Sequence, residues 1–179
     1  MKILIIVLAT GLASGSFDYT GRATMQDFKT FLQAGSKIYL YYRSYSRQMN
    51  GGDPKCIYIN HVTVLNATSF AYTEGYRKPD GRSIVYTVRA RISKNYSADS
   101  PPVIRATRSG LQRKYRFEYF DTMAACAVIT FSDGKCTTKC ELHIWAGNVA
   151  SGPSENCKRE YDYSCPGRKM YQVYDNTCF

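Results

Sequence analysis

The residues best suited to chemistry lie in one short stretch, KCTTKCELHIW, in the last third of the chain. It holds Cys136 and Cys140 with three residues between them, then Glu141, His143 and Trp145, the only tryptophan of the sequence. Thiolates and imidazoles bind zinc, paired cysteines form disulfides, and a carboxylate beside an aromatic ring can bind a cation. The stretch is consistent with a metal site, a disulfide staple or one wall of a ligand pocket.

A zinc site is the weakest of these three interpretations. Structural zinc takes four ligands, whereas Cys136, Cys140 and His143 supply only three. In an oxidising compartment such cysteines form disulfides instead. We therefore predict that the protein holds no metal ion and needs no cofactor.

The start of the chain has the layout of a secretory signal. Lys2 precedes an apolar run, Ile3–Leu12, and small residues follow at 13–15. The run is too short to span a bilayer, and a buried first strand is the alternative interpretation. We predict a signal peptide at residues 1–15 and a single domain at residues 16–179, secreted to the extracellular space and without a transmembrane segment.

The cysteine count fits a secreted protein. Seven cysteines allow three disulfides and leave one thiol over, and the sequence alone does not fix the pairing. The cysteines are Cys56, Cys126, Cys136, Cys140, Cys157, Cys165 and Cys178. Asn66 and Asn95 each open an Asn-X-Ser/Thr sequon, so both are predicted glycosylation sites.

The chain is basic, with 24 Lys and Arg and a formal net charge of +10. No block of five or six basic residues occurs, which argues against a nucleic-acid partner. Attraction to acidic cell-surface glycans or anionic membranes is one interpretation of the charge. We favour the simpler one, a solvated basic surface that keeps the protein soluble.

Period-two alternation of aromatic and β-branched residues dominates the chain and predicts strands. The predicted strands span residues 36–46, 55–65, 68–76, 82–93, 103–107, 113–120, 122–131 and 139–147. Helical patterns at residues 25–33 and 153–163 bracket them. Eight strands joined by short turns are typical of an all-β up-and-down barrel or sandwich, and an eight-stranded barrel can hold one small ligand.

In an extended strand Glu141, His143 and Trp145 share one face. If that face points inward, a carboxylate and aromatic rings would suit an ammonium group. Alternatively, Glu141 supports the barrel rim through a hydrogen bond or salt bridge, and His143 is an ordinary strand residue. Four further aromatic residues are candidates either for ligand contact or for core packing: Tyr42, Tyr86, Tyr115 and Phe117.

An ordered set of segments resembles the tick salivary lipocalins, the tick histamine-binding family. The segments are Asp27-Phe28-Lys29, KIYLYYRSY, KCIYI, ACAVITF, CELHIW, CKREYDYSC and YDNTCF, and they span nearly the whole mature chain. The resemblance implies an eight-stranded antiparallel lipocalin barrel with a short N-terminal helix and a C-terminal helix packed outside. It also implies the disulfides Cys56–Cys178, Cys126–Cys157 and Cys140–Cys165. Cys136 is then free or links two chains.

The resemblance also implies a ligand site. Amine binders of the family share Glu141, but they carry a second acid where this chain has Ala127 and an aromatic ring where it has His143. A buried ammonium needs full pairing, so the missing acid bears directly on amine binding. Asp27 and Phe28 of the first helix join the candidate ligand-binding residues. The acids that could replace the missing one are Asp27, Glu74 and Asp121.

Two functions follow from this resemblance. The first is a secreted salivary scavenger that sequesters histamine, serotonin or an apolar lipid mediator such as a leukotriene, and so suppresses host inflammation. The second is an immune or complement modulator that binds a host protein through the basic loops at residues 76–82 and 105–116. Catalysis is not expected, because the chain has two histidines and no nucleophile elbow or phosphate-binding loop. We predict a monomer, with a dimer through Cys136 as the alternative.

Overall fold

The computed structural model describes residues 22–49, 51–93, 100–134 and 137–178. The predicted signal peptide, Asn95 and Cys136 fall outside these ranges. Within them, no helix is long and apolar enough to cross a membrane. Asn66 is the exposed last residue of the second strand, and its side-chain oxygen accepts a hydrogen bond of 3.0 Å from the Thr68 amide in the following turn.

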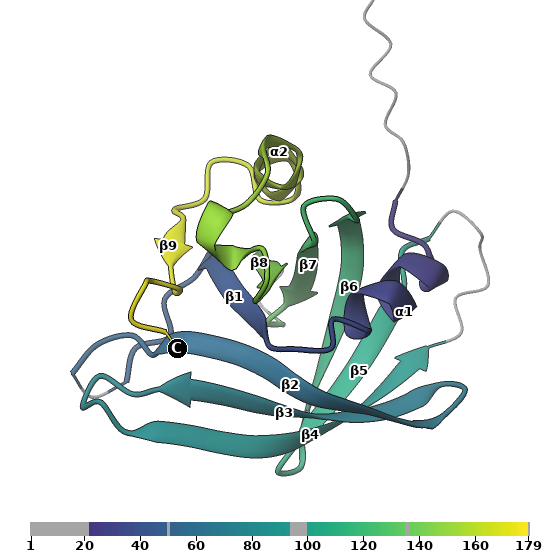
Figure 1. Cartoon of the computed structure of the whole chain (residues 1–179), viewed down its shortest axis with the longest axis horizontal. Coiled ribbons are helices and arrows are strands. Elements are labelled where there is room, and N and C mark those ends of the chain that lie inside the picture. The colour runs from purple at the N-terminus through teal and green to yellow at the C-terminus, as the bar shows by residue number, and fades with distance from the viewer. Residues whose placement is uncertain (1–21, 50, 94–99, 135–136, 179) are drawn as a thin grey trace, which may run out of the picture.

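Eight antiparallel strands form a closed barrel (Figure 1). They are β1 (Ile38–Arg43), β2 (Lys55–Asn66), β3 (Ser69–Arg77), β4 (Ser83–Ser93), β5 (Val103–Arg108), β6 (Leu111–Asp121), β7 (Cys126–Ser132) and β8 (Thr138–Trp145). Each strand pairs with the next along the chain, and β1 closes the sheet by pairing with both β8 and β2. The predicted fold class and strand order are confirmed.

Two details of the strands differ from the period-two prediction. The segment predicted as strand from residue 122 begins with a turn, because Asp121 accepts hydrogen bonds from the Met123 and Ala124 amides. A two-residue strand, β9 (Tyr171–Gln172), pairs with the end of β1. Two residues carry no periodicity, so sequence patterning could not reveal it.

The helix α1 (Met25–Leu32) closes one end of the barrel. Thr24 caps it: its hydroxyl accepts from the Asp27 amide at 3.1 Å, and the Asp27 carboxylate accepts from the Thr24 amide at 2.7 Å. The buried face of the helix inserts Phe28 and Phe31 among barrel residues, with both rings against Phe117 at centroid distances of 5.2 and 5.3 Å. This packing of aromatic rings forms the interior core.

The helix α2 (Glu155–Ser164) packs on the outside of the barrel, over β7 and β8 (Figure 1). A short 3-10 turn (Val149–Ser151) leads into it, and the Ser154 hydroxyl caps it by accepting from the Cys157 amide at 3.2 Å. On the inner face of α2, the fully buried side chain of Tyr161 packs with the outward side chains Leu142 and Ile144 of β8. The barrel wall therefore separates two cores, one inside it and one beneath α2.

Three disulfides fasten the C-terminal segment to this frame, and they are the pairs that the resemblance implied. Cys126–Cys157 and Cys140–Cys165 tie β7 and β8 to the two ends of α2. Cys56–Cys178 joins the start of β2 to the end of the chain, 122 residues away. Each closure restricts the unfolded chain and stabilises the fold by roughly 2–4 kcal/mol.

We predict that Phe117→Ala lowers the free energy of unfolding by about 3–5 kcal/mol, because it leaves a void among the rings of α1 and the barrel. Urea denaturation followed by intrinsic fluorescence measures this change. The matched control is Leu111→Ala on the same strand, whose side chain is 76% exposed and whose loss should change the free energy by less than about 0.5 kcal/mol. Equal effects of the two substitutions would contradict the packing described here.

Candidate functional site

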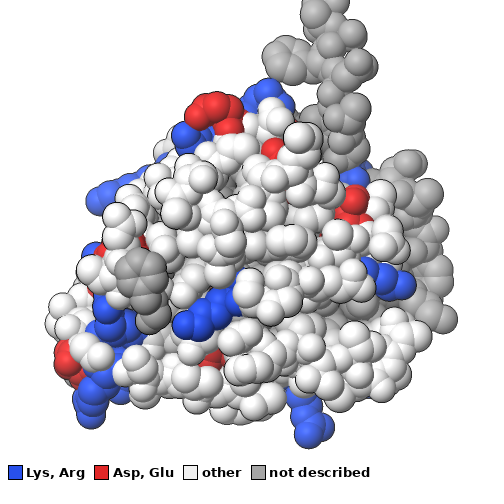
Figure 2. Space-filling model, in the orientation of Figure 1, with Lys and Arg blue, Asp and Glu red and all other residues white. Residues whose placement is uncertain are grey.

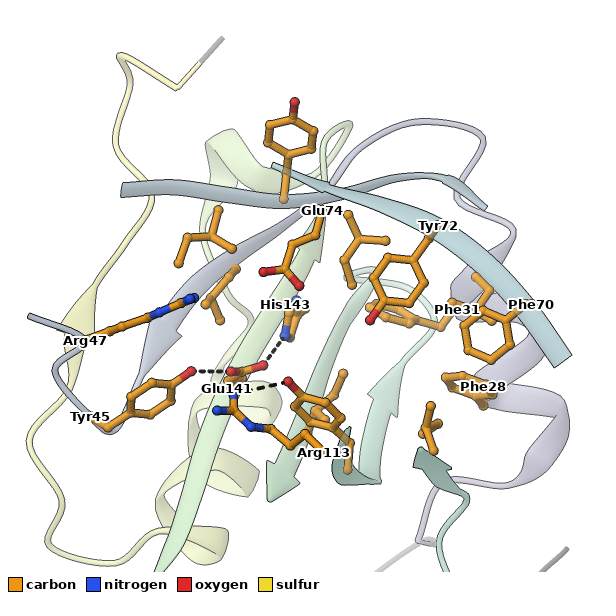
Figure 3. A pocket seen from close by; sticks show the side chains of 18 residues that line it. Phe28, Phe31, Tyr45, Arg47, Phe70, Tyr72, Glu74, Arg113, Glu141 and His143 are labelled. Atoms are coloured by element: carbon orange, nitrogen blue, oxygen red, sulfur yellow. Dashed lines mark hydrogen bonds and ion pairs between the residues drawn. The ribbon is translucent and has the colours of Figure 1, made fainter. Parts of the chain in front are cut away.

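A cavity of about 90 Å³ lies inside the barrel. A single water needs roughly 10–15 Å³ measured in this way, so the space suits a small molecule rather than a long chain. The end of the cavity near Phe28, Phe31 and Phe70 is apolar, and polar side chains gather at the opposite end (Figure 3). The lining residues are Phe28, Phe31, Leu32, Leu40, Tyr45, Arg47, Ile57, Tyr58, Ile59, Phe70, Tyr72, Glu74, Ile104, Arg113, Tyr115, Ile129, Glu141 and His143.

The buried carboxylate of Glu141 is the centre of the polar part. Its Oε1 accepts a hydrogen bond of 2.5 Å from the Tyr45 hydroxyl, and its Oε2 lies 3.1 Å from Nε2 of His143. Burial by itself raises the pKa of Glu141, but the hydrogen bond and charge of His143, the Tyr45 hydrogen bond and the charge of Arg113 outweigh it and leave the pKa lowered. Glu141 is therefore held as a carboxylate inside the barrel.

A second acid, Glu74 on β3, points into the same space. Figure 3 shows its carboxylate directed toward His143 and Glu141 from the opposite wall. The Tyr86 hydroxyl donates a hydrogen bond to it. Burial raises the pKa of Glu74, the Tyr86 bond opposes this, and the charge of Glu141 raises it further. The cavity thus holds two acids whose pKa values are shifted in opposite directions. The shift favours the charged form of Glu141 and the neutral form of Glu74.

Two arginines, Arg47 and Arg113, also line the cavity. The guanidinium of Arg113 donates to the Tyr115 hydroxyl at 3.4 Å, and burial followed by the charge of Glu141 raises the pKa of Tyr115. Arg47 comes from the loop after β1. That loop is held by Asp53, whose carboxylate accepts from the Arg47 amide at 2.9 Å and pairs with buried Arg43 at 3.1 Å.

One buried ring nitrogen of His143 has no partner within the described part of the chain. Nδ1 of His143 is buried and has no hydrogen-bond partner among the described residues, while its Nε2 faces Glu141. Buried ring nitrogens are almost always hydrogen-bonded in folded proteins.

Among the predicted ligand residues, Glu141, His143, Phe28 and Tyr115 line the cavity together. Strand alternation placed Glu141 and His143 on one face, and in the structure this face lines the cavity, whereas Leu142 packs on the other side under α2. Tyr45, Arg47, Tyr72 and Arg113 were not predicted, since they come from a loop and from strands distant in sequence.

The other predicted residues lie outside the cavity lining. Trp145 ends β8 where α1 crosses the barrel, and its indole Nε1 donates to the Phe31 carbonyl at 3.0 Å. Asp27 is partly exposed, and its carboxylate caps α1 by accepting from the Thr24 amide. Tyr86 does not line the cavity, and its hydroxyl donates a hydrogen bond to Glu74. Phe117 is fully buried and packs against the ring of Phe28.

Tyr42, a predicted ligand residue, lies on the outer side of the sheet and packs against the core beneath α2. A bulge between Leu40 and Tyr42 shifts the β1–β8 register, so Tyr42 lies opposite Leu142 and Arg43 lies opposite Glu141. One extra residue reverses every later side chain of a strand. Buried Arg43 is the consequence, and its charge is met by Asp53.

The disulfide pairing decides the role of Cys140. The sulfur of Cys140 is bonded to that of Cys165, so Cys140 cannot serve as a thiolate ligand for zinc. Asp121, the third candidate for a second acid, accepts hydrogen bonds from the turn after β6 and from the Ser154 hydroxyl at 2.9 Å. The described part of this stretch, residues 137–145, carries a disulfide on one face and part of the cavity wall on the other.

Comparison with known families identifies the chain. The profile described as tick histamine binding protein matches residues 18–179. The protein belongs to this family. The family and the fold are those of ligand-binding lipocalins. No curated protein matches the chain.

Solved structures share the fold at low sequence identity. "Crystal Structure of AM182 Serotonin Complex" superposes with a TM-score of 0.59 at 17% identity, over 84% of this chain and 92% of that one. Lobster apocrustacyanin A1 gives 0.55 at 12% identity, over 87% and 89%. Apocrustacyanin C2 gives 0.54 at 11% identity, over 88% and 91%. At these identities the similarity establishes the barrel architecture alone.

We predict opposite effects of Glu74→Gln and Glu141→Gln on the pH dependence of unfolding. The raised pKa of Glu74 stabilises the fold below the ordinary glutamate pKa, and this contribution is lost as pH rises. The lowered pKa of Glu141 stabilises the fold above that value, and this contribution is lost as pH falls. Relative to the wild type, Glu74→Gln should therefore gain stability between pH 4 and pH 7, whereas Glu141→Gln should lose it. Chemical denaturation at both pH values measures the change, and a shift of the same sign in both variants would contradict these assignments.

Proposed function

We propose that this lipocalin binds a small cationic amine inside the barrel and thereby sequesters it. The observation that carries the proposal is the pair of acids, Glu141 and Glu74, facing one small cavity from opposite walls. Glu74 supplies a second carboxylate although the chain has Ala127 where the resemblance would place an acid. It is one of the three acids that sequence reasoning named for this role.

The amine would be bound by charge, hydrogen bonds and aromatic contact together. A buried ammonium loses its hydration, so it needs carboxylates and acceptors around it. Glu141 offers a stable negative charge, and an approaching ammonium would lower the raised pKa of Glu74 and recruit its second charge. The rings of Tyr45, Tyr72 and Tyr115 line the same space and can add cation–π attraction.

An imidazole or indole ring attached to the amine fits the remaining wall. Phe28, Phe31 and Phe70 form an apolar end of the cavity for the ring. The cavity volume favours a molecule of this size over a long lipid. The family match and the serotonin complex of a structural neighbour support the same ligand class.

Secretion and a scavenging role complete the proposal. The apolar N-terminal segment and three disulfides are typical of a chain that folds in the secretory pathway. A secreted protein that binds a host amine stoichiometrically lowers its free concentration without turnover, and so dampens inflammation. This is a function of binding, for which a barrel with a buried polar cavity suffices.

An anionic lipid is the second candidate, favoured by Arg47 and Arg113. Both guanidinium groups line the cavity and could pair with a carboxylate. The two acids oppose this, because they would repel a buried anion at close range. The small volume opposes a long acyl chain as well.

We predict that Glu141→Gln and Glu74→Gln each weaken histamine or serotonin binding at least tenfold, since loss of one partner of a buried charge pair costs about 2–5 kcal/mol. Titration calorimetry with both amines at pH 7 measures this. Glu155→Gln removes the same charge from an 88% exposed side chain on α2 and should leave the affinity unchanged.

Substitution of Arg113 distinguishes amine binding from fatty-acid binding. Arg113→Gln should leave amine affinity equal or improved, because it removes a like charge from the cavity, and it should weaken binding of a fatty-acid probe. If neither amine binds the wild type, or if both glutamate variants bind amines as the wild type does, the amine proposal is wrong. Fatty-acid binding that Arg113→Gln abolishes would then establish the second candidate.

A further inference from the structure

A row of cations crosses the outside of the barrel on three neighbouring strands. The β4–β5 register places Arg91 directly opposite Arg105, and the β5–β6 register places Arg105 directly opposite Lys114. Because adjacent strands lie about 4.8 Å apart, the three residues span about 10 Å of sheet. All three are exposed, and exposed Arg89 precedes Arg91 on the same face. These four residues are called the basic row.

The basic row is not explained by the folded chain itself. Like charges directly opposite one another destabilise a sheet. Within the described part of the chain, no member of the row forms an ion pair. Glu118, an acid farther along β6, is instead held by Arg116 at 2.9 Å and by the Thr130 hydroxyl at 2.7 Å. The positive field of the row is left open to a partner.

The sheet register changes the interpretation of the net charge. The sequence shows cations spread along the chain, which favoured a merely solvated surface. Over most of the face in Figure 2, basic side chains are indeed interspersed with acidic ones. In the basic row, residues from three separate sequence segments come together without such mixing. A concentrated field of one sign attracts a polyanion.

The neighbours of the row indicate what kind of polyanion fits. Thr107 lies opposite Arg89 and Gln112 lies opposite Thr107, so the cations are flanked by hydroxyl and amide groups. Guanidinium groups bind oxyanions bidentately, and hydroxyl and amide groups hydrogen-bond to sugar hydroxyls. None of these six side chains is aromatic for stacking a nucleic-acid base, or large and apolar for entering a membrane. We propose that the basic row binds a linear sulfated polysaccharide.

This surface is independent of the barrel cavity. Ala90 and Ala106, which alternate with the row residues along β4 and β5, are buried in the interior core, so the row side chains point the opposite way. Both sites can be occupied together. A protein held on cell-surface sulfated glycans would keep its open cavity at the tissue where amines are released.

The test is binding of the full secreted protein to immobilised heparin in 0.15 M NaCl. The triple variant Arg91→Ser, Arg105→Ser, Lys114→Ser should bind at least tenfold more weakly and elute at lower salt, because it removes the contiguous charges. Its thermal midpoint should equal or exceed that of the wild type, since a repulsion is removed. Its affinity for histamine should be unchanged.

A matched triple variant controls for net charge. Arg159→Ser, Arg168→Ser, Lys169→Ser removes three exposed cations from α2 and the segment after it, and it should change heparin affinity less than threefold. The proposal is overturned if the wild type fails to bind heparin, if the two triple variants lose equal affinity, or if desulfated heparin binds as well. Tighter binding to phosphatidylserine vesicles or to single-stranded DNA than to heparin would reassign the row to that partner.

Discussion

The cavity is organised by the need to keep the carboxylate of Glu141 charged inside a protein barrel. Removing an ion from water costs several kcal/mol unless donors replace the lost hydration. Tyr45 and His143 supply those donors, and each is fixed by a different part of the fold. His143 follows from strand alternation on β8, whereas Tyr45 depends on the loop after β1 that Asp53 and buried Arg43 hold in place. A loop far from β8 in sequence is thereby tied to the centre of the cavity.

The frame around this carboxylate is stiff because both surfaces of the barrel wall are packed. Inside, Phe28 and Phe31 of α1 meet Phe117. Outside, α2 covers the outward side chains of β7 and β8 and is bonded to both strands by disulfides. Glu141 therefore lies between the packed interior and an outer helix that two disulfides anchor, and a ligand would meet a preformed site rather than order one. Preorganisation of this kind reduces the free energy lost on binding.

The same strands present different side chains to the interior and to the exterior of the barrel. On β4 and β5, small buried alanines alternate with exposed arginines. The interior holds a small cavity lined by two acids, while the exterior row places charges on an open sheet. Period-two geometry lets one strand serve both sides, because successive side chains point in opposite directions.

The sequence by itself determined the eight strands, the two helices and the placing of Glu141 and His143 on one face of their strand, because each depends on local periodicity. That this face lines the cavity was decided by the tertiary structure. The disulfide pairs were implied by family resemblance and are confirmed. Only the tertiary structure decided the rest. A single bulge turned Tyr42 outward, and the position of α1 took Trp145 out of the cavity lining. The approach of Glu74 to Glu141 and the alignment of Arg91, Arg105 and Lys114 both depend on pairing between distant strands. Such pairing is set by long-range register and barrel closure, which no local pattern encodes.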